Sequence, residues 1–161
     1  MNPASNFQQE PVMIIEACRR GAKPMGRFSV EITLINNRDR ILAEAGALEE
    51  GNVRQMTLEG TVDSGAARLV LPESVADQLG FEEVGEARVR YADRRLATRR
   101  IVTEVRLRLG GREAVFDAIL EPDRTTALIG AIVLETLDLL IDCTNETLHP
   151  RDPDRIVAEI E

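Results

Sequence analysis

The chain has 161 residues, a formal net charge of −8 and an aromatic content of 3% without tryptophan. This length suits one domain with its own hydrophobic core, which must be built mainly from aliphatic side chains. The negative charge argues against nucleic acid or an anionic membrane as the main partner, and no apolar run reaches the length of a membrane span.

The first third of the chain predicts one clear strand. Residues 1–24 are interpreted as an N-terminal extension, in which the apolar stretch Pro11–Ala17 can add an edge strand. From Phe28 to Leu34, apolar and polar residues alternate, which is typical of a half-buried strand. The polar residues Asn36–Asp39 predict a turn, and Arg40–Asn52 predicts a longer connection.

A second alternating stretch, Gln55–Val62, predicts a strand that leads directly to Asp63. Three small residues, Ser64-Gly65-Ala66, interrupt the strand, and the apolar run Leu69–Leu71 resumes it. Asp63 is therefore expected where a strand ends on a tight turn and where the backbone can approach another group closely.

Residues 72–80 predict a short helix, because Pro72 suits its first position and Gly80 suits its C-terminal cap.

The middle of the chain predicts hairpins. Alternating residues over 87–91 and 101–109, separated by a turn at 92–95, predict two paired strands. Gly110-Gly111 predicts a tight turn into Ala114–Leu120, a mostly apolar strand.

A second motif, Ala127-Leu128-Ile129-Gly130, is an apolar run closed by glycine, and residues 131–137 after it have the spacing of a short helix. Leu139–Ile141 predicts the last strong strand, and residues 151–161 form a charged tail. Many short strands with two short helices indicate a mainly β barrel.

The Asp63 motif and the Gly130 motif together resemble those of the retropepsin-like aspartic proteases, most closely the small bacterial members, over roughly residues 26–150. The resemblance implies a retropepsin-like closed β-barrel with a flap hairpin and one or two short helices, active as a homodimer. Residues 25–150 then form the protease domain.

Asp63 is the candidate catalytic residue. Two neighbouring carboxylates cannot both ionise, so one acts as base and the other as acid, as is established for aspartic proteases. The chain carries one such motif, so the pair requires a homodimer that joins Asp63 of both subunits on a two-fold axis. The expected function is hydrolysis of peptide bonds in polypeptide substrates by an aspartic endopeptidase.

The resemblance also assigns supporting roles around Asp63. Ser64 is expected to hydrogen-bond across the two-fold axis, and Gly65 to let the substrate backbone come close. Support for the active-site loop is expected from two short runs of the sequence: Ser64, Gly65 and Ala66 within the loop, and Leu128, Ile129 and Gly130 behind it.

The segment from about Val84 to Val105 occupies the place of the flap, a hairpin that covers the substrate and excludes water. Its tip, residues 91–95, contains no glycine. The candidate substrate contacts at this tip are Tyr91, Ala92, Asp93 and Arg94. For Tyr91 the favoured interpretation is a plain strand residue, and substrate contact is the alternative.

Arginine is concentrated between residues 88 and 112, where nine arginines face only Asp93 and Glu104. The favoured interpretation is the solvated face of a hairpin. The alternative is that a basic flap recruits acidic peptide segments.

Other interpretations also follow from the sequence. An Asp-Ser-Gly turn often contains an aspartate that only caps its own backbone. A non-catalytic dimerisation or peptide-binding module needs the same fold without a proton-sharing pair, and a plain barrel that binds a small molecule needs only a monomer. A nucleophilic pair of Ser64 with His149 lacks the turn motif that exposes such serines.

Cys18 and Cys143 are too few for a disulfide framework, and with His149 as the single histidine they provide no zinc-ligand spacing. We therefore expect no metal ion and no cofactor. The first residues lack the pattern of a signal peptide, so a reducing cytoplasm is the expected location.

Overall fold

The structure is a computed structural model that describes residues 15–16, 27–154, 156 and 158–161. Its strands are β1 (Ile15–Glu16), β2 (Phe28–Asn36), β3 (Gln55–Val62), β4 (Leu69–Pro72), β5 (Glu82–Arg90), β6 (Leu96–Leu109), β7 (Arg112–Glu121), β8 (Ala127–Ile129), β9 (Leu139–Asp142) and β10 (Thr147–Pro150). Its helices are α1 (Asn37–Glu44), α2 (Glu73–Leu79) and α3 (Ala131–Thr136), with a 3₁₀ turn, η1, at Glu50–Asn52.

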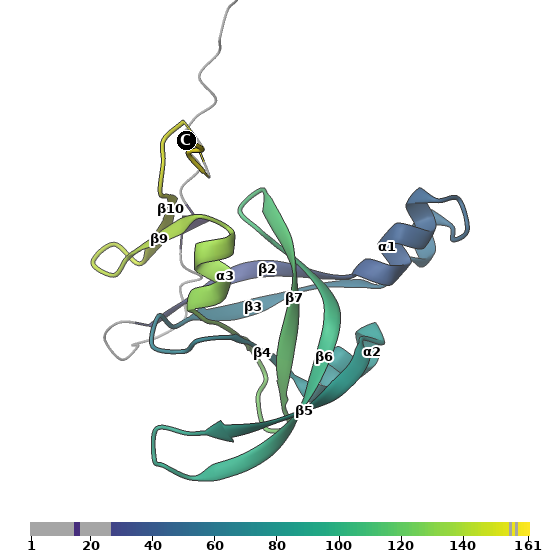
Figure 1. The fold of residues 1–161 in the computed structure, drawn as a ribbon, viewed down its shortest axis with the longest axis horizontal. Helices are drawn as coiled ribbons and strands as arrows, with labels where there is room; N and C mark the ends of the chain where they lie inside the picture. The colour runs from purple at the N-terminus through teal and green to yellow at the C-terminus, as the bar shows by residue number, and fades with distance from the viewer. Residues whose placement is uncertain (1–14, 17–26, 155, 157) are drawn as a thin grey trace, which may run out of the picture.

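Six strands close into a barrel in the order β2-β3-β8-β4-β7-β6, and β6 pairs back onto β2. Closure pairs the two strands that would otherwise be the edges of this sheet. Strand β5 pairs with β6 outside the barrel, and the two strands form a long hairpin that extends away from it (Figure 1). The prediction of a mainly β, retropepsin-like fold with a closed barrel and few helices is confirmed.

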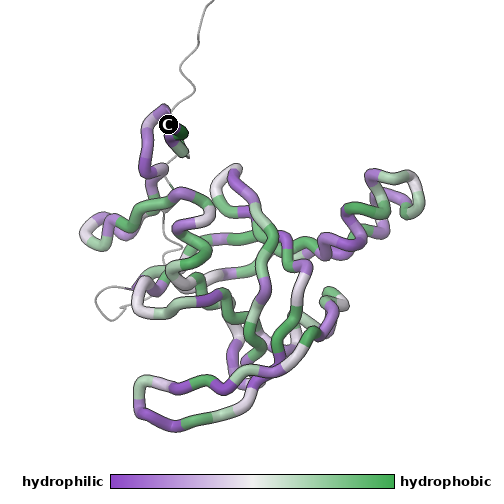
Figure 2. Tube along the Cα trace, viewed as in Figure 1, coloured by the Kyte–Doolittle hydropathy of each residue, from purple (hydrophilic) through white to green (hydrophobic). Residues whose placement is uncertain are grey.

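The barrel interior is filled by aliphatic side chains from alternate positions. In β2, Phe28, Val30, Ile32 and Leu34 are almost completely buried. The same alternation recurs in the other barrel strands, where green and purple segments follow one another along the tube (Figure 2). Each fully buried aliphatic side chain contributes roughly 1.5–3 kcal/mol to folding, so an aromatic-poor chain still forms a stable core.

The prediction of a loop after β2 is wrong, because this segment forms helix α1, which projects from the barrel (Figure 1). The buried Asn36 caps the helix: its side-chain oxygen accepts hydrogen bonds from the backbone N–H groups of Arg38 (3.1 Å) and Asp39 (3.2 Å). Its side-chain amide also donates to the carbonyl of Leu79. Asparagine favours both turns and helix starts, so the sequence alone did not separate the two.

Asp39 fixes the base of this projection. Its carboxylate accepts hydrogen bonds from the Arg54 backbone N–H at 3.0 Å and from the Arg54 guanidinium at 2.7 and 2.9 Å. These hydrogen bonds from Arg54 hold the pKa of Asp39 below its usual value. The pair ties the first turn of α1 to the start of β3.

Helix α2 ends as predicted, because Gly80 adopts the left-handed conformation with φ 65° that terminates helices. It starts one residue later than predicted, since Pro72 is the N-cap and not the first helical residue.

A second, three-stranded sheet has the order β1-β10-β9. The sequence indicated Leu139–Ile141 as the last strand, but β10 follows it. The turn between them is stabilised by Asp142, whose carboxylate accepts the backbone N–H groups of Thr144 and Asn145, both at 3.0 Å. Apart from Ile15 and Glu16, the predicted edge strand Pro11–Ala17 lies outside the described residues. No described helix is long and apolar enough to cross a membrane.

Candidate functional site

Asp63 lies immediately after β3, on the turn that its sequence predicts. Strands β3 and β8 are parallel, and the Asp63 backbone N–H extends their ladder by donating to the carbonyl of Ile129 at 3.1 Å. The Asp63 carbonyl accepts the N–H of Ala66 at 3.1 Å, which closes a tight turn over Ser64 and Gly65. The backbone of the barrel therefore determines where this aspartate stands.

The two carboxylate oxygens of Asp63 have different partners. Oδ1 accepts the backbone N–H of Gly65 at 2.9 Å, and Oδ2 pairs with Nη2 of Arg27 at 2.8 Å. The side chain of Asp63 is 14% exposed and that of Arg27 is 59% exposed. The carboxylate thus has an orientation fixed by its own loop, solvent access, and an exposed cation as its counter-ion.

Sequence reasoning missed Arg27. This residue precedes β2 by one position, and Phe28 of β2 pairs with Val62 of β3, so the next pair along the ladder would be Arg27 and Asp63. The sequence predicted both strands, over 28–34 and over 55–62. It did not show which residues of the two strands pair, so it could not place Arg27 beside Asp63.

Gly130 packs directly against the loop that follows Asp63. A Cβ atom at this position would lie 2.4 Å from the carbonyl oxygen of Arg68 and 2.8 Å from that of Ala66, so no larger residue fits without moving the backbone. The first N–H groups of α3 donate to the same loop, from Ala131 to the Ala66 carbonyl (2.8 Å) and from Ile132 to the Ala67 carbonyl (3.1 Å).

The structure therefore brings the two sequence motifs together. Ile129 is fully buried and pairs with Val62, while Leu128 pairs with Val70. Ser64 is exposed and makes no side-chain hydrogen bond to any described residue.

The β5–β6 hairpin occupies the place expected for a flap. Its tip closes without glycine, because Arg94 adopts the left-handed conformation with φ 67° that glycine usually takes. The Arg94 N–H donates to the Tyr91 carbonyl at 2.9 Å, and the Tyr91 N–H donates to the Arg95 carbonyl at 3.0 Å. Ala92, Asp93 and Arg94 are exposed at this tip.

Tyr91 is not a plain strand residue. It lies just beyond the end of β5, and its hydroxyl donates to Oε1 of Glu121 on β7 at 2.5 Å. Burial, with this hydrogen bond in addition, raises the pKa of Tyr91. Arg99 binds the same Glu121 oxygen at 3.1 Å, and the Arg95 guanidinium lies 4.4 Å from the centre of the Tyr91 ring. Tyr91 therefore links the hairpin to the barrel wall.

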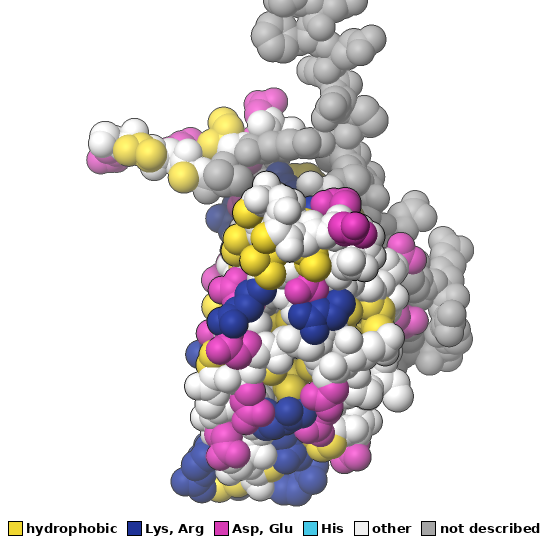
Figure 3. Space-filling view, turned by 90° about the vertical axis from the view of Figure 1, so that its right-hand side faces the viewer, with side chains coloured by type: hydrophobic (Ala, Val, Ile, Leu, Met, Phe, Trp, Pro, Cys, Tyr) yellow, Lys and Arg dark blue, Asp and Glu magenta, His cyan; other side chains and the backbone are white. Residues whose placement is uncertain are grey.

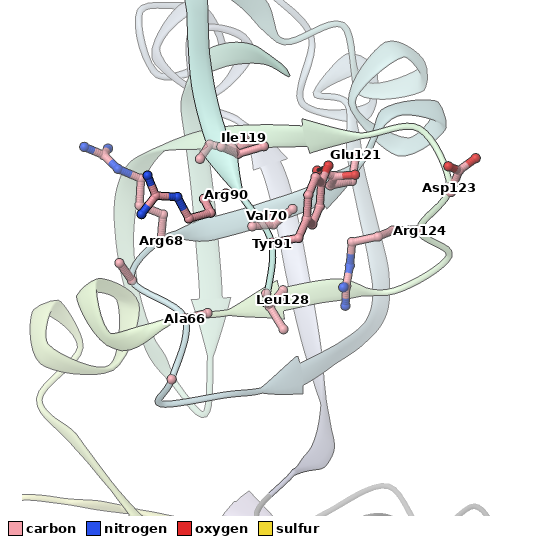
Figure 4. A pocket seen from close by; sticks show the side chains of 13 residues that line it. Ala66, Arg68, Val70, Arg90, Tyr91, Ile119, Glu121, Asp123, Arg124 and Leu128 are labelled. Atoms are coloured by element: carbon pink, nitrogen blue, oxygen red, sulfur yellow. Dashed lines mark hydrogen bonds between the residues drawn. The ribbon is translucent and has the colours of Figure 1, made fainter. Parts of the chain in front are cut away.

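A pocket of about 540 Å³ lies between the loop after Asp63 and the base of the hairpin tip (Figure 4). Its lining comprises Gly65, Ala66, Ala67, Arg68, Val70, Val89, Arg90, Tyr91, Ile119, Glu121, Asp123, Arg124 and Leu128. Of the predicted site residues, Gly65, Ala66, Tyr91 and Leu128 line this pocket.

Most of the arginines of the hairpin region are paired. Six of the nine arginines between residues 88 and 112 have a carboxylate within 4.0 Å: Arg95, Arg99, Arg100, Arg106, Arg108 and Arg112. Basic and acidic side chains accordingly intermingle on the face shown in Figure 3, and basic groups gather at its lower end, the level of the hairpin tip in Figure 1. Much of the basic block is therefore neutralised within the protein.

The remaining candidate groups lie elsewhere. The His149 ring is hydrogen-bonded to the Thr147 hydroxyl at 2.7 Å, and Cys143 is a free, exposed thiol. Cys18 lies outside the described residues. Within the described part of the chain, no group of three or more possible ligand residues could hold a metal ion.

Residues 50–133 match the sequence model of a protein family described as aspartyl protease. This range is just over half of the chain and contains both Asp63 and Gly130. The chain belongs to this family of retropepsin-like aspartic proteases.

The solved structures that match this chain do so at low sequence identity. A retropepsin-like aspartic protease from Rickettsia conorii has 20% identity and a TM-score of 0.49, over 84% of this chain and 86% of that one. The foamy viral protease-reverse transcriptase, solved with an RNA/DNA hybrid, has 18% identity and a TM-score of 0.41, over 48% of this chain and 10% of that one. The simian foamy virus (mac) protease has 14% identity and a TM-score of 0.39, over 48% of this chain and 80% of that one. No curated protein sequence matches this chain.

Proposed function

We propose that this protein is an aspartic endopeptidase that acts as a homodimer, with Asp63 of each subunit as the catalytic pair. The observation that carries the proposal is the position of Asp63, a solvent-accessible carboxylate held on a backbone-braced turn beside a pocket. Family membership supports the same reaction class.

In the proposed reaction, the two Asp63 carboxyl groups share one proton. The ionised group takes a proton from a water molecule as that water attacks the peptide carbonyl. The protonated partner donates its proton to the nitrogen of the amine that leaves. One subunit provides one such carboxylate, so the reaction requires the second copy. The β5–β6 hairpin would exclude bulk water from this step.

The ion pair between Arg27 and Asp63 must break when the two Asp63 carboxyl groups come together. A salt bridge whose arginine is largely exposed contributes only about 0–1 kcal/mol, because solvent screens it. Approach of the second subunit can therefore displace Arg27 at little cost.

The same ion pair gives a reason to retain a second candidate function. A non-catalytic peptide-binding or dimerisation module has no need for a free carboxylate, and Asp63 paired with Arg27 suits that function equally well.

Hydrolysis of unfolded casein, measured from about pH 4 to pH 8, tests the proposal. We expect cleavage that a statine-type inhibitor blocks and that Asp63→Asn reduces by at least about 10²–10⁴-fold, the usual contribution of a positioned acid–base group. Asp154→Asn, which removes an exposed carboxylate near the end of the chain, is the matched control and should keep full activity.

Sedimentation at micromolar concentration establishes whether the sample is a dimer. A wild-type dimer that cleaves casein at no pH in this range contradicts the protease proposal and favours the peptide-binding module.

Asp39 contributes to the stability of the fold at acid pH, which bounds the pH range of the assay. Because Arg54 lowers the pKa of Asp39 in the folded protein, this pair stabilises the fold fully above the unfolded value of about 3.9. That stability is lost as the pH falls through the lower folded value. Circular dichroism at each pH therefore separates loss of activity from loss of fold.

A further inference from the structure

The pocket beside Asp63 contains three arginines that have no acidic partner in the part of the chain that the structure describes. Arg68, Arg90 and Arg124 line it, and none has a carboxylate within 4.0 Å among the described residues. Arg68 precedes β4, Arg90 ends β5 and Arg124 lies in the β7–β8 loop, so three separate elements contribute the charge.

The acidic residues of the same pocket do not neutralise these arginines. Glu121 already accepts hydrogen bonds from Tyr91 and Arg99. Asp123 is exposed, and in Figure 4 its carboxylate points away from the side chains of Arg68 and Arg90.

Arg124 is partly buried, and its only hydrogen bond to a described residue runs from Nε to the carbonyl of Thr126 at 3.1 Å. Burial lowers the pKa of Arg124; the Glu121 carboxylate opposes this effect, Arg27 adds to it and Asp63 opposes it. The guanidinium is therefore partly desolvated and lies within electrostatic reach of the proposed catalytic carboxylate.

Apolar side chains form the rest of the pocket: Val70, Val89, Ile119 and Leu128. Figure 4 shows the side chains of Arg68 and Arg90 at one end of this apolar lining and Arg124 toward the other. An occupant that fits this arrangement has an aliphatic stem and an anionic end. Glutamate has both, and aspartate has a shorter stem.

We propose that this pocket selects polypeptide substrates with an acidic side chain, whose carboxylate is held by Arg68 and Arg90 while its stem packs on Val70 and Val89. Guanidinium groups match carboxylates in geometry and form charge-assisted hydrogen bonds with them. Arg124 adds to the positive potential of the pocket. The proposal rests on the proposed function only in taking a polypeptide to be the occupant.

This selectivity has a defined dependence on pH and salt. It requires an ionised substrate carboxyl group, so it is present at neutral pH and is lost as the pH falls through about 4.3, the unperturbed value of glutamate. Salt weakens it, because the arginines at the pocket entrance are exposed.

Binding to protein that carries Asp63→Asn tests the selectivity without cleavage. Immobilised protein is incubated at pH 7 with a mixed library of hexapeptides capped at both ends, so that no terminal carboxylate competes. Captured peptides should be enriched in glutamate or aspartate at one position. In a fluorescent matched pair, the selected peptide should bind about 10-fold more tightly than its Glu→Gln analogue.

Two further variants, made in the Asp63→Asn protein, test whether Arg68 and Arg90 cause the preference for acidic peptides. Adding Arg68→Gln and Arg90→Gln together should reduce the preference to about 2-fold or less. Arg88→Gln removes one charge from the same hairpin but lies outside the pocket, so it should leave the preference unchanged.

The proposal is overturned if no peptide is captured, if captured peptides show no acidic enrichment, or if the preference survives in the double variant. Its failure is distinguishable from that of the protease proposal. Casein cleavage without acidic preference contradicts the pocket alone, whereas acidic preference without cleavage contradicts catalysis alone.

Discussion

The loop that carries Asp63 and the β5–β6 hairpin that faces it are held in opposite ways. Backbone groups fix the loop: its N–H and carbonyl groups bond to β8 and α3, and Gly130 packs against it with no room for a side chain. Side chains fix the hairpin: most of β5 is exposed, and Tyr91 attaches the tip to Glu121.

This difference indicates that the Asp63 loop is the fixed region and that the β5–β6 hairpin is the region that can move. Backbone N–H and carbonyl groups do not titrate, so the hydrogen bonds that place the Asp63 backbone do not depend on the protonation of any side chain. An exposed hairpin with few buried contacts belongs to the least stable part of a fold and opens most readily. A cover that must admit a substrate needs that property.

Among three substitutions that test this comparison, Gly130→Ala should have the largest effect. The added methyl group would lie 2.4 and 2.7 Å from backbone atoms of Arg68, so the loop must move. We expect a loss of about 1–3 kcal/mol of unfolding free energy, measured by urea denaturation, and a loss of casein cleavage of about 10²-fold.

Gly51→Ala is the matched control for this substitution, because a Cβ atom there meets no other atom within 4 Å. Equal stability of the two variants would show that the loop does not depend on close backbone packing.

A smaller, local effect is expected from Tyr91→Phe. This change removes the hydroxyl that donates to Glu121 but keeps the ring beneath Arg95, and Glu121 keeps its bond to Arg99. A loss of about 1 kcal/mol should raise amide hydrogen exchange in the hairpin about 5-fold. Exchange of the Asp63 and Ala66 amides should stay unchanged. An equal rise at these two amides would contradict the separation between the two regions.

The smallest effect on stability is expected from Arg27→Gln, at most about 0.5 kcal/mol, because the arginine is exposed. Its effect on casein cleavage should also be small, about 2-fold or less, because the exposed Arg27 leaves Asp63 when the proposed pair forms. A loss of cleavage of about 10-fold or more would contradict this and would show that the proposed reaction depends on Arg27. Arg88→Gln, which removes an exposed charge from β5, is the control.

The sequence predicted those features that depend on local pattern. Alternation located β2, β3 and β6, two consecutive glycines marked the β6–β7 turn, and small residues after a strand marked the Asp63 loop. Helix α1 was missed because a polar run that starts with Asn36 fits a turn as well as a capped helix.

The rest of the site depends on contacts between distant segments. Arg27 reaches Asp63 only through the register of β2 on β3, and Tyr91 reaches Glu121 only because β7 lies beneath the hairpin. No short window of sequence contains either pair. The sequence shows the block of arginines over 88–112, but the acidic residues that neutralise most of it come from other elements.

Closure of the barrel through β2 and β6 also affects how the chain folds. During synthesis β2 and β3 emerge first, yet Leu34 pairs with Leu107, and β3 lies beside β8, which is made later still. The β2–β3 hairpin therefore keeps its two edges unpaired until β6 and β8 have been synthesised. Such non-local pairing places folding in the range of milliseconds to seconds, and it makes the newly made chain most prone to aggregation before β8 is complete.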